Sequence, residues 1–449
     1  MSETKPSYDD LLARIDQLLE SNRQLVARVR ELEEELKAAH RQSAPFRRRE
    51  ALKKPADKKK KPGRPPGHPG AHRAVPSEID AEIVEPLACC PHCSGEVTGV
   101  IERVQFIEEC PVVKPIRTKL TTYTGVCVHC GEVDSRHPLQ TSRATGAAGS
   151  HLGPRAQALA ISLVHQSGLS MKKACDTLWN TCGLKLSAGG LAQLLQRAAE
   201  RSSEMFDEIL TSIRQSPAVN ADETSWYVGQ PGWWLWVFTT PTATAYIVDK
   251  SRGADVVDRV LGDAFAGMLV TDCLASYNAI DCPKHKCIAH HLRVLKEHEQ
   301  SLERRGCQSQ YLFLWKVLLK NVIDTWNRRE EFGERKFLKI VDRINRGVEL
   351  LLGRSPPEPE EVRFRDRLNR QRDHLLGCLR EPAAEPTNNR AERDLRPAVI
   401  NRKISCGNRT DGGKTAWQVM RSIAVTIQHR GQNFLDVMAS RLVLAPHGR

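Results

Sequence analysis

The chain has 449 residues, a formal net charge of +13 and 14 cysteines. This length predicts two to four domains, and the positive charge favours a polyanionic partner. The polar start of the chain is unlike a signal peptide, and no apolar run reaches the 18 or so residues of a membrane span. We therefore expect a cytoplasmic protein, in which paired cysteines bind metal more often than they form disulfides.

A heptad repeat marks residues 8–37 and predicts a coiled coil over residues 1–41. Leucine recurs at every seventh position, and an asparagine occupies one position of the alternate seam (Leu11, Leu18, Leu25, Leu32; Asn22). Leucine at d, with a single buried Asn at a, favours a parallel two-stranded coil. The alternative is an amphipathic helix that packs on its own chain. We expect self-association through this segment.

Residues 42–85 form a basic segment that Pro and Gly interrupt throughout, so we expect no regular structure. Its centre, Lys61-Pro-Gly-Arg64-Pro, resembles an AT-hook, in which arginine lies in a narrow minor groove. With the preceding lysines (Lys58, Lys59, Lys60) it should bind phosphates in a strongly salt-dependent way. The alternative is a solvated linker without a defined partner.

Two C-x₂-C pairs, Cys90/Cys93 and Cys127/Cys130, predict a zinc ribbon over residues 86–137. Four thiolates satisfy one tetrahedral Zn²⁺, and a ribbon this small needs the metal to fold. Cys89 is an alternative ligand to Cys90. The segment from Glu102 to Thr122 is rich in Val, Ile and Thr, which predicts strands. The ribbon either contacts DNA or is only structural.

Residues 150–205 show apolar residues at helical spacing, with Gly168 and Gly183 between the runs and Ser187 as an expected N-cap. Helices broken in this way resemble a helix-turn-helix. A plain helical connector fits the same pattern.

The region 215–299 alternates strands and helices. Strands are expected at 218–228, 233–240, 243–248 and 267–271, with a helix at 255–261. A fifth strand at Cys287–Ala289 would lead into a helix from His290. Three antiparallel strands, a helix and a buried strand predict a mixed α/β sheet with helices on its faces. This order resembles a ribonuclease H-like fold.

Three acidic residues lie where a catalytic metal site could form. Asp222 and Asp272 belong to short apolar runs that read as strands, and Glu392 lies in a polar, Arg-rich helix. Carboxylates so placed can converge on two Mg²⁺ ions, the arrangement that cuts and joins phosphodiesters. Glu223 and Asp394 are the rival ligands, although their spacing from the chosen acids directs them to other faces.

The remaining segments complete the expected architecture. Residues 300–385 are charged and helix-like, and we expect a helical insertion between two parts of the catalytic domain, the second at 386–435. Residues 436–449 are expected to be a tail. Ser405–Lys414 is Gly-rich but lacks the P-loop spacing; we interpret it as a loop before a helix at Thr415–His429.

Several motifs together resemble the transposases of the insertion sequence 66 family. They are Asp222-Glu-Thr with Trp-Trp-Leu-Trp-Val, Thr271-Asp272 with Ser276-Tyr277, Cys287-Ile-Ala-His290, and Asn388-Asn-Arg-Ala-Glu-Arg-Asp-Leu-Arg-Pro397. The resemblance covers nearly the whole chain. It implies that Asp222, Asp272 and Glu392 are the metal-binding carboxylates, and that Cys287 and His290 support the site rather than bind zinc.

The resemblance also implies a function, a Mg²⁺-dependent transposase that cleaves 3′ ends of an element and joins them to target DNA. Arginines around Glu392 would hold phosphates (Arg390, Arg393, Arg396, Arg402). The partners would be double-stranded DNA, a second copy and accessory proteins of the same element, in a bacterial nucleoid. The alternatives are a non-catalytic DNA-binding regulator, an inactive descendant, or a nuclease that does not join.

Overall fold

The computed structural model describes residues 17, 21, 24, 25, 28, 73–142 and 151–443. The chain divides into two units, residues 46–114 and residues 1–45 with 115–449. Within the described ranges, no helix combines the length and the apolar character that are needed to cross a bilayer.

In the first unit, the described residues 73–114 contain no helix and no strand. The strands expected between Glu102 and Thr122 are wrong, because this whole stretch is described and has none. Strands β1 (Thr124–Cys127) and β2 (Gly131–Asp134) come after it and form an antiparallel hairpin. Val104 and Ile107 are 67% and 81% exposed. β-Branched residues favour strands only where they have a surface to pack on.

Four helices precede the large sheet, and they confirm the helical prediction for this region: α2 (Pro154–His165), α3 (Met171–Cys182), α4 (Ala188–Arg201) and α5 (Ser203–Arg214). Ser187 is the N-cap of α4, and its hydroxyl accepts a hydrogen bond from Gly190 N at 3.0 Å. Gly183 ends α3 in the left-handed conformation, which glycine adopts without strain. Their apolar faces join a core that continues under the sheet.

The sheet has five strands in the order β5-β4-β3-β6-β7. They are β3 (Ala218–Val228), β4 (Gln230–Thr239), β5 (Thr244–Asp249), β6 (Met268–Thr271) and β7 (Lys284–Lys286). The first three are antiparallel, whereas β6 and β7 run parallel to β3. Helix α6 (Ala254–Leu261) connects β5 to β6. The predicted mixed sheet is confirmed, but the fifth strand ends before Cys287, which is the N-cap of the next helix.

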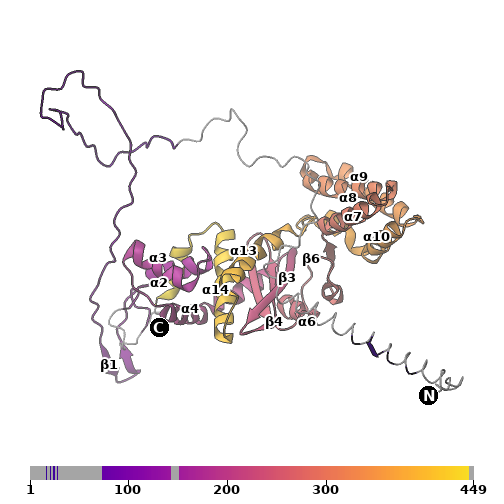
Figure 1. The fold of residues 1–449 in the computed structure, drawn as a ribbon. Helices are drawn as coiled ribbons and strands as arrows, with labels where there is room; N and C mark the ends of the chain where they lie inside the picture. Colours follow the sequence, from indigo (N-terminus) through magenta and orange to yellow (C-terminus); the bar gives the residue numbers. More distant parts are fainter. Residues whose placement is uncertain are drawn as a thin grey trace, which may run out of the picture. The chain divides into compact units, whose positions relative to one another are not determined.

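The two faces of the sheet are covered by different helices (Figure 1). Leu235 and Val237 pack with α13 (Asn389–Ser405) and α14 (Asp411–His429), whereas Trp236 and Phe238 point into the core on the α5 and α6 side. Strand residues alternate in this way because successive side chains point to opposite faces. Parity therefore separates the α13 side from the α5 and α6 side, whereas α14 contributes to both cores.

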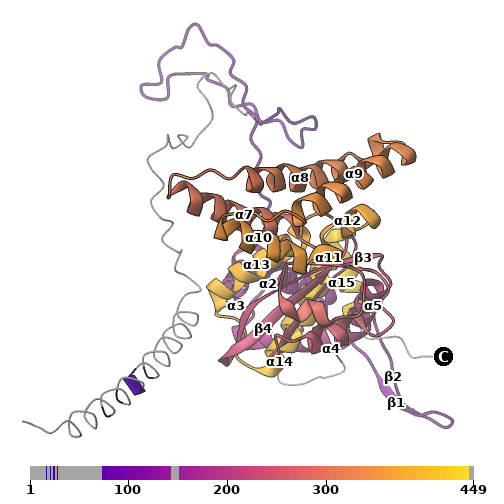
Figure 2. The same cartoon turned by 90° about the vertical axis from the view of Figure 1, so that its right-hand side faces the viewer.

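Between β7 and α13 the chain forms a helical region with its own apolar core. It contains α7 (Ile288–Glu303), α8 (Gln310–Asn327), α9 (Glu334–Leu352), α10 (Pro359–Arg370) and two short helices, α11 (Arg372–Leu375) and α12 (Gly377–Arg380). Figure 2 shows these helices gathered together beside the sheet. Ile288, Leu295 and Leu302 belong to this core, so the insertion begins with α7, before the expected boundary at residue 300.

The last segments differ from expectation at two points. Helix α14 begins at Asp411, capped by the Thr410 hydroxyl, so only the first half of Ser405–Lys414 is a loop. Residues 436–442, expected in a tail, belong to α15 (Phe434–Leu442), which packs on α2 and buries Met438 and Leu442. A nine-residue helix gives only a short periodic signal, which explains why the pattern was missed.

Candidate active site

Asp222 and Asp272 lie on the same side of the sheet in the strand direction, beyond the paired parts of the parallel strands β3 and β6. Asn220 on β3 is paired in parallel with Val270 on β6, and each aspartate follows its paired residue by two positions. Parallel strands thereby bring both carboxylates to one end of the sheet. Backbone N–H groups orient them: Asp222 Oδ1 accepts from Glu223 N at 2.9 Å, and Asp272 Oδ1 accepts from Leu274 N at 2.8 Å.

Glu392 enters from the first turn of α13, and a buried asparagine fixes this turn against the sheet. Asn388 is the N-cap residue of α13 and is fully buried. Its Nδ2 donates to Ala221 O at 2.8 Å, and its Oδ1 accepts from Asn220 Nδ2 at 3.1 Å. Both bonds go to the two residues that directly precede Asp222, so they hold the helix that carries Glu392 beside that carboxylate.

Cys287 and His290, predicted as supporting residues, lie at the start of α7 beside the acids. The Cys287 thiol is buried and accepts a hydrogen bond from Asn388 N at 3.1 Å, while Cys287 N donates to Thr271 O at 2.8 Å. Burial raises the pKa of this thiol, which keeps it neutral. His290 Nε2 lies 3.9 Å from Glu392 Oε1; burial, followed by the charge of Arg293, lowers the pKa of His290.

The pKa of Asp222 reflects its burial and the acids around it. Burial raises the pKa of Asp222 to about 7, and the negative charges of Glu223, Asp272 and Glu392 add to this effect. Each nearby carboxylate disfavours ionisation of the next. Such a cluster attracts a cation, and hard divalent ions prefer oxygen ligands. As the side chains stand, no group of three or more His, Cys, Asp or Glu residues in the described part of the chain is arranged to hold a metal ion.

The rival acid Glu223 lies on the opposite face of β3. Its carboxylate is 2% exposed and pairs with Arg252 at 2.8 Å and with the Tyr277 hydroxyl at 2.8 Å. The Arg252 guanidinium also lies 4.2 Å from the centre of the Trp234 ring. Glu223 is therefore held by its own partners on the other face, and its negative charge still adds to the rise in the pKa of Asp222.

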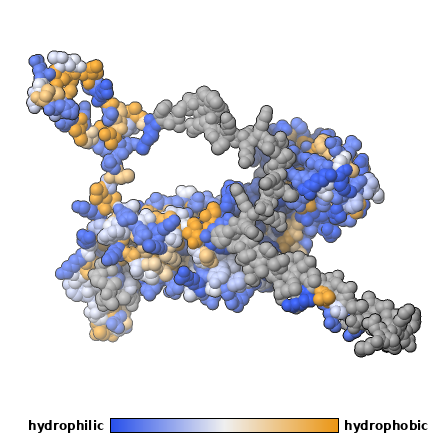
Figure 3. Space-filling model, in the orientation of Figure 1, coloured by the Kyte–Doolittle hydropathy of each residue, from blue (hydrophilic) through white to orange (hydrophobic). Residues whose placement is uncertain are grey.

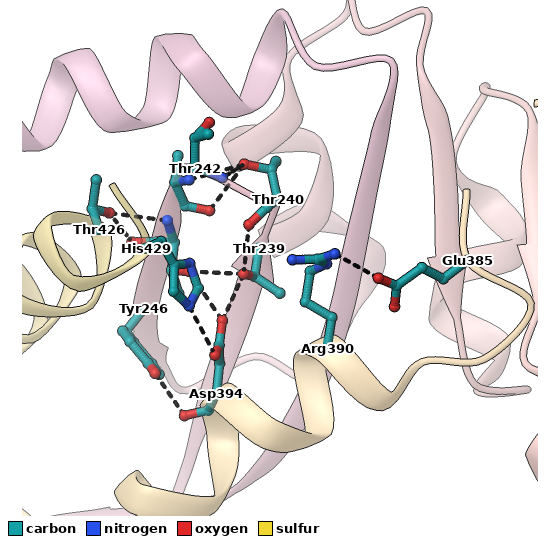
Figure 4. A network of polar contacts seen from close by, with 11 residues as sticks. Thr239, Thr240, Thr242, Tyr246, Glu385, Arg390, Asp394, Thr426 and His429 are labelled. Carbon is teal, nitrogen blue, oxygen red and sulfur yellow. Dashed lines mark hydrogen bonds and ion pairs between the residues drawn. The ribbon is translucent and has the colours of Figure 1, made fainter. Parts of the chain in front are cut away.

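The second rival, Asp394, lies in a buried polar network that anchors α13 (Figure 4). Its carboxylate accepts hydrogen bonds from Thr239 at 2.6 Å and Thr244 at 3.0 Å and pairs with His429 at 3.3 Å. Burial alone would raise the pKa of Asp394, but the bonds from His429 and Thr239 outweigh it and lower the pKa. The Tyr246 hydroxyl donates to Asp394 O at 2.6 Å. Asp394 thus sets the rotation of α13 instead of joining the acidic cluster.

The four arginines around Glu392 fall into two pairs. Arg390 pairs with Glu385 at 2.5 Å (Figure 4), and Arg402 donates to Ser225 and Thr224 on β3. Arg393 and Arg396 are exposed. The first two arginines therefore stabilise the fold, and the last two are available to phosphates.

Each predicted zinc pair forms its own tight turn. Ser94 N donates to Cys90 O at 2.8 Å, and Cys90 N donates to Gly95 O at 2.9 Å. Backbone N–H groups of His92 and Cys93 hydrogen-bond the Cys90 thiol and lower its pKa, and those of His129 and Cys130 do the same for Cys127. N–H groups directed at a sulfur stabilise the thiolate that zinc needs. These contacts favour Cys90 over Cys89.

Several predicted residues lie outside the described residues: Leu11, Leu18, Asn22, Leu32, Lys58, Lys59, Lys60, Lys61 and Arg64. Leu25 is described; it is helical and 62% exposed.

The buried Asn220–Asn388 pair was not predicted from the sequence. The only signal in the chain was an asparagine inside an apolar run (Val219-Asn-Ala) and a second one just before a helix. A buried amide must find partners, and these two find each other.

Comparison with known proteins gives two matches. The family model described as Transposase IS66 family matches residues 149–416, which include all three acids. A stretch of 78 residues is 36% identical to the uncharacterized protein y4jO of Sinorhizobium fredii (strain NBRC 101917 / NGR234). That stretch is 17% of this chain and 24% of the relative, so the match spans about a quarter of the relative's length.

Proposed function

Because the chain belongs to the IS66 transposase family, we propose that it is a DNA transposase that cleaves the 3′ ends of its element and joins them to target DNA with Mg²⁺. The observation that supports the proposal is the placement of Asp222 and Asp272 after paired positions of two parallel strands, with the helix that carries Glu392 bonded to the residue before Asp222. A regulator that only binds DNA would have no use for this cluster, which costs stability.

We further propose that the sheet is a ribonuclease H-like fold. Three antiparallel strands followed by two that are parallel to the first, with the acids on β3 and after β6, support this assignment. The helical region α7–α12 is then an insertion between β7 and the helix that carries Glu392.

We propose that the three carboxylates would bind two Mg²⁺ ions, because hard ions prefer oxygen ligands and each of the three acids is partly exposed. When bound, the metals polarise the attacking and the leaving oxygen of the phosphodiester. The protein supplies the rest: Asn388 and Asp394 fix α13, Asp222 releases its proton as metal binds, and Arg393 and Arg396 hold phosphates.

The N-terminal segments would add affinity for DNA and for a second copy. We propose that residues 1–41 dimerise and that the basic segment at 42–85 holds phosphates. Sedimentation of the chain with and without residues 1–41 tests the dimerisation. Both segments precede the proposed catalytic part in the sequence. They would keep the protein near its own DNA in the bacterial cytoplasm.

Strand transfer in vitro tests the proposed activity. The reaction contains a labelled element end with a pre-cut 3′-hydroxyl, a target plasmid and Mg²⁺, and it compares the wild type with Asp272→Asn. We expect joined product from the wild type and a loss on the order of 10³-fold in the variant, because an amide is a poor ligand for Mg²⁺.

Asp207→Asn is the matched control, since Asp207 is an exposed aspartate of α5, away from the cluster. DNA binding is measured beside joining, with purified accessory proteins of the element added in parallel. Equal product from the wild type and Asp272→Asn would show that the assigned acids are wrong. Binding without joining in every mixture would favour the regulator or an inactive descendant.

We also propose one structural Zn²⁺ bound by Cys90, Cys93, Cys127 and Cys130, supported by the spacing and by the turn at each pair. We expect about one zinc per chain in the purified wild type and none after Cys127→Ser with Cys130→Ser, since two thiolates hold the ion poorly. Elemental analysis measures this. The control Cys89→Ser should keep its zinc, and loss of zinc there would make Cys89 the ligand.

A further inference from the structure

A small cavity lies next to the helix that carries Glu392. Its volume is about 200 Å³, and it opens between the end of α2, the second half of α13 and α14. Most of its wall is apolar (Val164, Ala398, Ile400, Ile404 and Trp417). Ile400 and Ile404 are each 51% exposed at the rim, and Figure 3 shows a hydrophobic patch over α13 among hydrophilic surface. Large exposed apolar side chains gathered at a cavity mark a binding surface.

Arg421 gives this cavity a buried cation. Its side chain is 8% exposed, it donates from Nη1 to His165 O, and its guanidinium lies 5.8 Å from the centre of the Tyr246 ring. Among the described residues it forms no ion pair with an acidic side chain; the Tyr246 hydroxyl interacts with the guanidinium, and Nε has no hydrogen-bond acceptor. Buried arginines are normally paired. An occupant with acceptor atoms would provide the hydrogen-bond acceptor that Arg421 Nε lacks.

The neighbouring histidine does not serve as that partner. His165 lines the cavity, and neither of its ring nitrogens has a hydrogen bond among the described residues. Burial, followed by the charge of Arg421, lowers the pKa of His165 to about 3. The imidazole is therefore neutral at pH 7, and Arg421 is the charge that an occupant meets.

The position of the cavity relates it to the catalytic cluster. Pro397, Ile400 and Ile404 lie on one face of α13, and Arg393 continues this face towards the start of the helix, where Glu392 lies. At 1.5 Å per residue, Ile400 and Ile404 are about 12–18 Å along the axis from Glu392. A DNA strand at the acids that followed this face would pass Arg393 and Arg396 and reach the cavity after about four or five nucleotides.

We propose that the cavity receives one nucleobase that is turned out of the duplex near the element end. The inference rests on the proposed transposase function. The apolar wall suits the faces of a planar ring, and Arg421 suits the acceptor atoms on its edge. A phosphate would lose its hydration against Ile, Val and Ala. The volume lies below the 300–1,000 Å³ that drug-sized ligands occupy, which limits the occupant to a single ring system.

The test places 2-aminopurine, in turn, at each of the first eight positions of either strand in a duplex of the element end. The fluorescence of this base increases when it leaves the stack of neighbouring bases. With the full-length wild type we expect a rise of about threefold or more at one position, four or five nucleotides from the cleaved phosphate. Ser167 is exposed at the cavity mouth, so Ser167→Trp should fill the opening and abolish the rise.

Two further variants sharpen the result. Ser355→Trp changes an equally exposed serine in the loop after α9 and should leave the rise intact. Arg421→Met keeps the length of the side chain but removes its donors, and it should reduce the rise and weaken binding about tenfold or more. An abasic site at the responsive position should make the wild type and Ser167→Trp bind equally well.

The outcomes separate this inference from the proposed function. If the wild type binds and joins DNA but no position shows increased 2-aminopurine fluorescence, the proposal of a bound nucleobase is wrong. The proposed transposase function would remain. A change in oligomeric state with Ser167→Trp and an unchanged fluorescence profile would assign the cavity to a second copy and would also overturn it. A wild type that neither binds nor joins the element end would remove both proposals.

Discussion

Asp222→Asn is expected to abolish strand transfer and, in the same protein, to raise the stability of the metal-free fold at neutral pH. The activity should fall on the order of 10³-fold or more, because the amide cannot replace a charged metal ligand. The stability should rise because the pKa of Asp222 is about 7 in the folded chain, against about 3.9 when unfolded.

The sign of the stability change follows from proton linkage. Below about pH 4 the carboxyl is protonated in both states and contributes nothing. Between about pH 4 and pH 7 the unfolded chain ionises first, so the folded wild type loses stability as the pH rises. The amide does not ionise, and the variant should therefore gain about 4 kcal/mol over the wild type above pH 7, and almost nothing at pH 4.

Urea unfolding in EDTA across this pH range measures the difference, and Asp207→Asn is again the control. Added Mg²⁺ should stabilise the wild type and have little effect on Asp222→Asn, since a ligand stabilises only the state that binds it. A variant less stable than the wild type at pH 8 in EDTA would contradict the acidic cluster. Retained strand transfer would remove Asp222 from the metal site.

Asp394→Ala is expected to lower the free energy of unfolding by about 3–5 kcal/mol, the cost of breaking a buried charged pair. The change leaves the hydroxyls of Thr239 and Thr244 and the His429 ring without their acceptor (Figure 4). It also frees the start of α13, so strand transfer should fall even where the variant is fully folded. The effect should shrink as the pH falls below the unfolded pKa of about 3.9, because the lowered pKa stabilises only the ionised form.

Asp411→Ala is the matched comparison. Asp411 also lies near the start of a helix and pairs with Lys414 at 3.0 Å, but its side chain is 79% exposed. Exposed pairs contribute little, so we expect a change of at most about 0.5–1 kcal/mol in urea unfolding. If the two alanine variants were equally stable, the buried network would not be what holds α13 in place.

The sheet could be predicted from the sequence because its signals are local. Strands such as β3 and β4 follow from runs of apolar and aromatic residues around a turn, and Asp222 and Asp272 could be chosen because each belongs to such a run. Their separation from Glu223 followed from strand parity, which the bonds of Glu223 to Arg252 and Tyr277 confirm.

The parts that escaped prediction depend on contacts between distant segments. Nothing near Asn388 indicates that its amide reaches Ala221, 167 residues earlier. Cys287–Ala289 looked like a strand because it is apolar, yet the parallel pairing to β6 ends at Lys286 and Cys287 caps a helix. The segment Glu102–Thr122 has strand-forming residues without a surface on which to pack, so local preference alone misled.

The bond from Asn388 to Ala221 also has a consequence for protein synthesis. Glu392 is made 170 residues after Asp222, a delay of roughly 10–30 s at the usual pace of a ribosome. During that interval the growing chain already has its basic segment and Asp222, and Asp272 follows 50 residues later, but it lacks the helix that carries Glu392. A partly made chain would therefore have the segment proposed to bind DNA before it had the helix that the proposed cleavage requires.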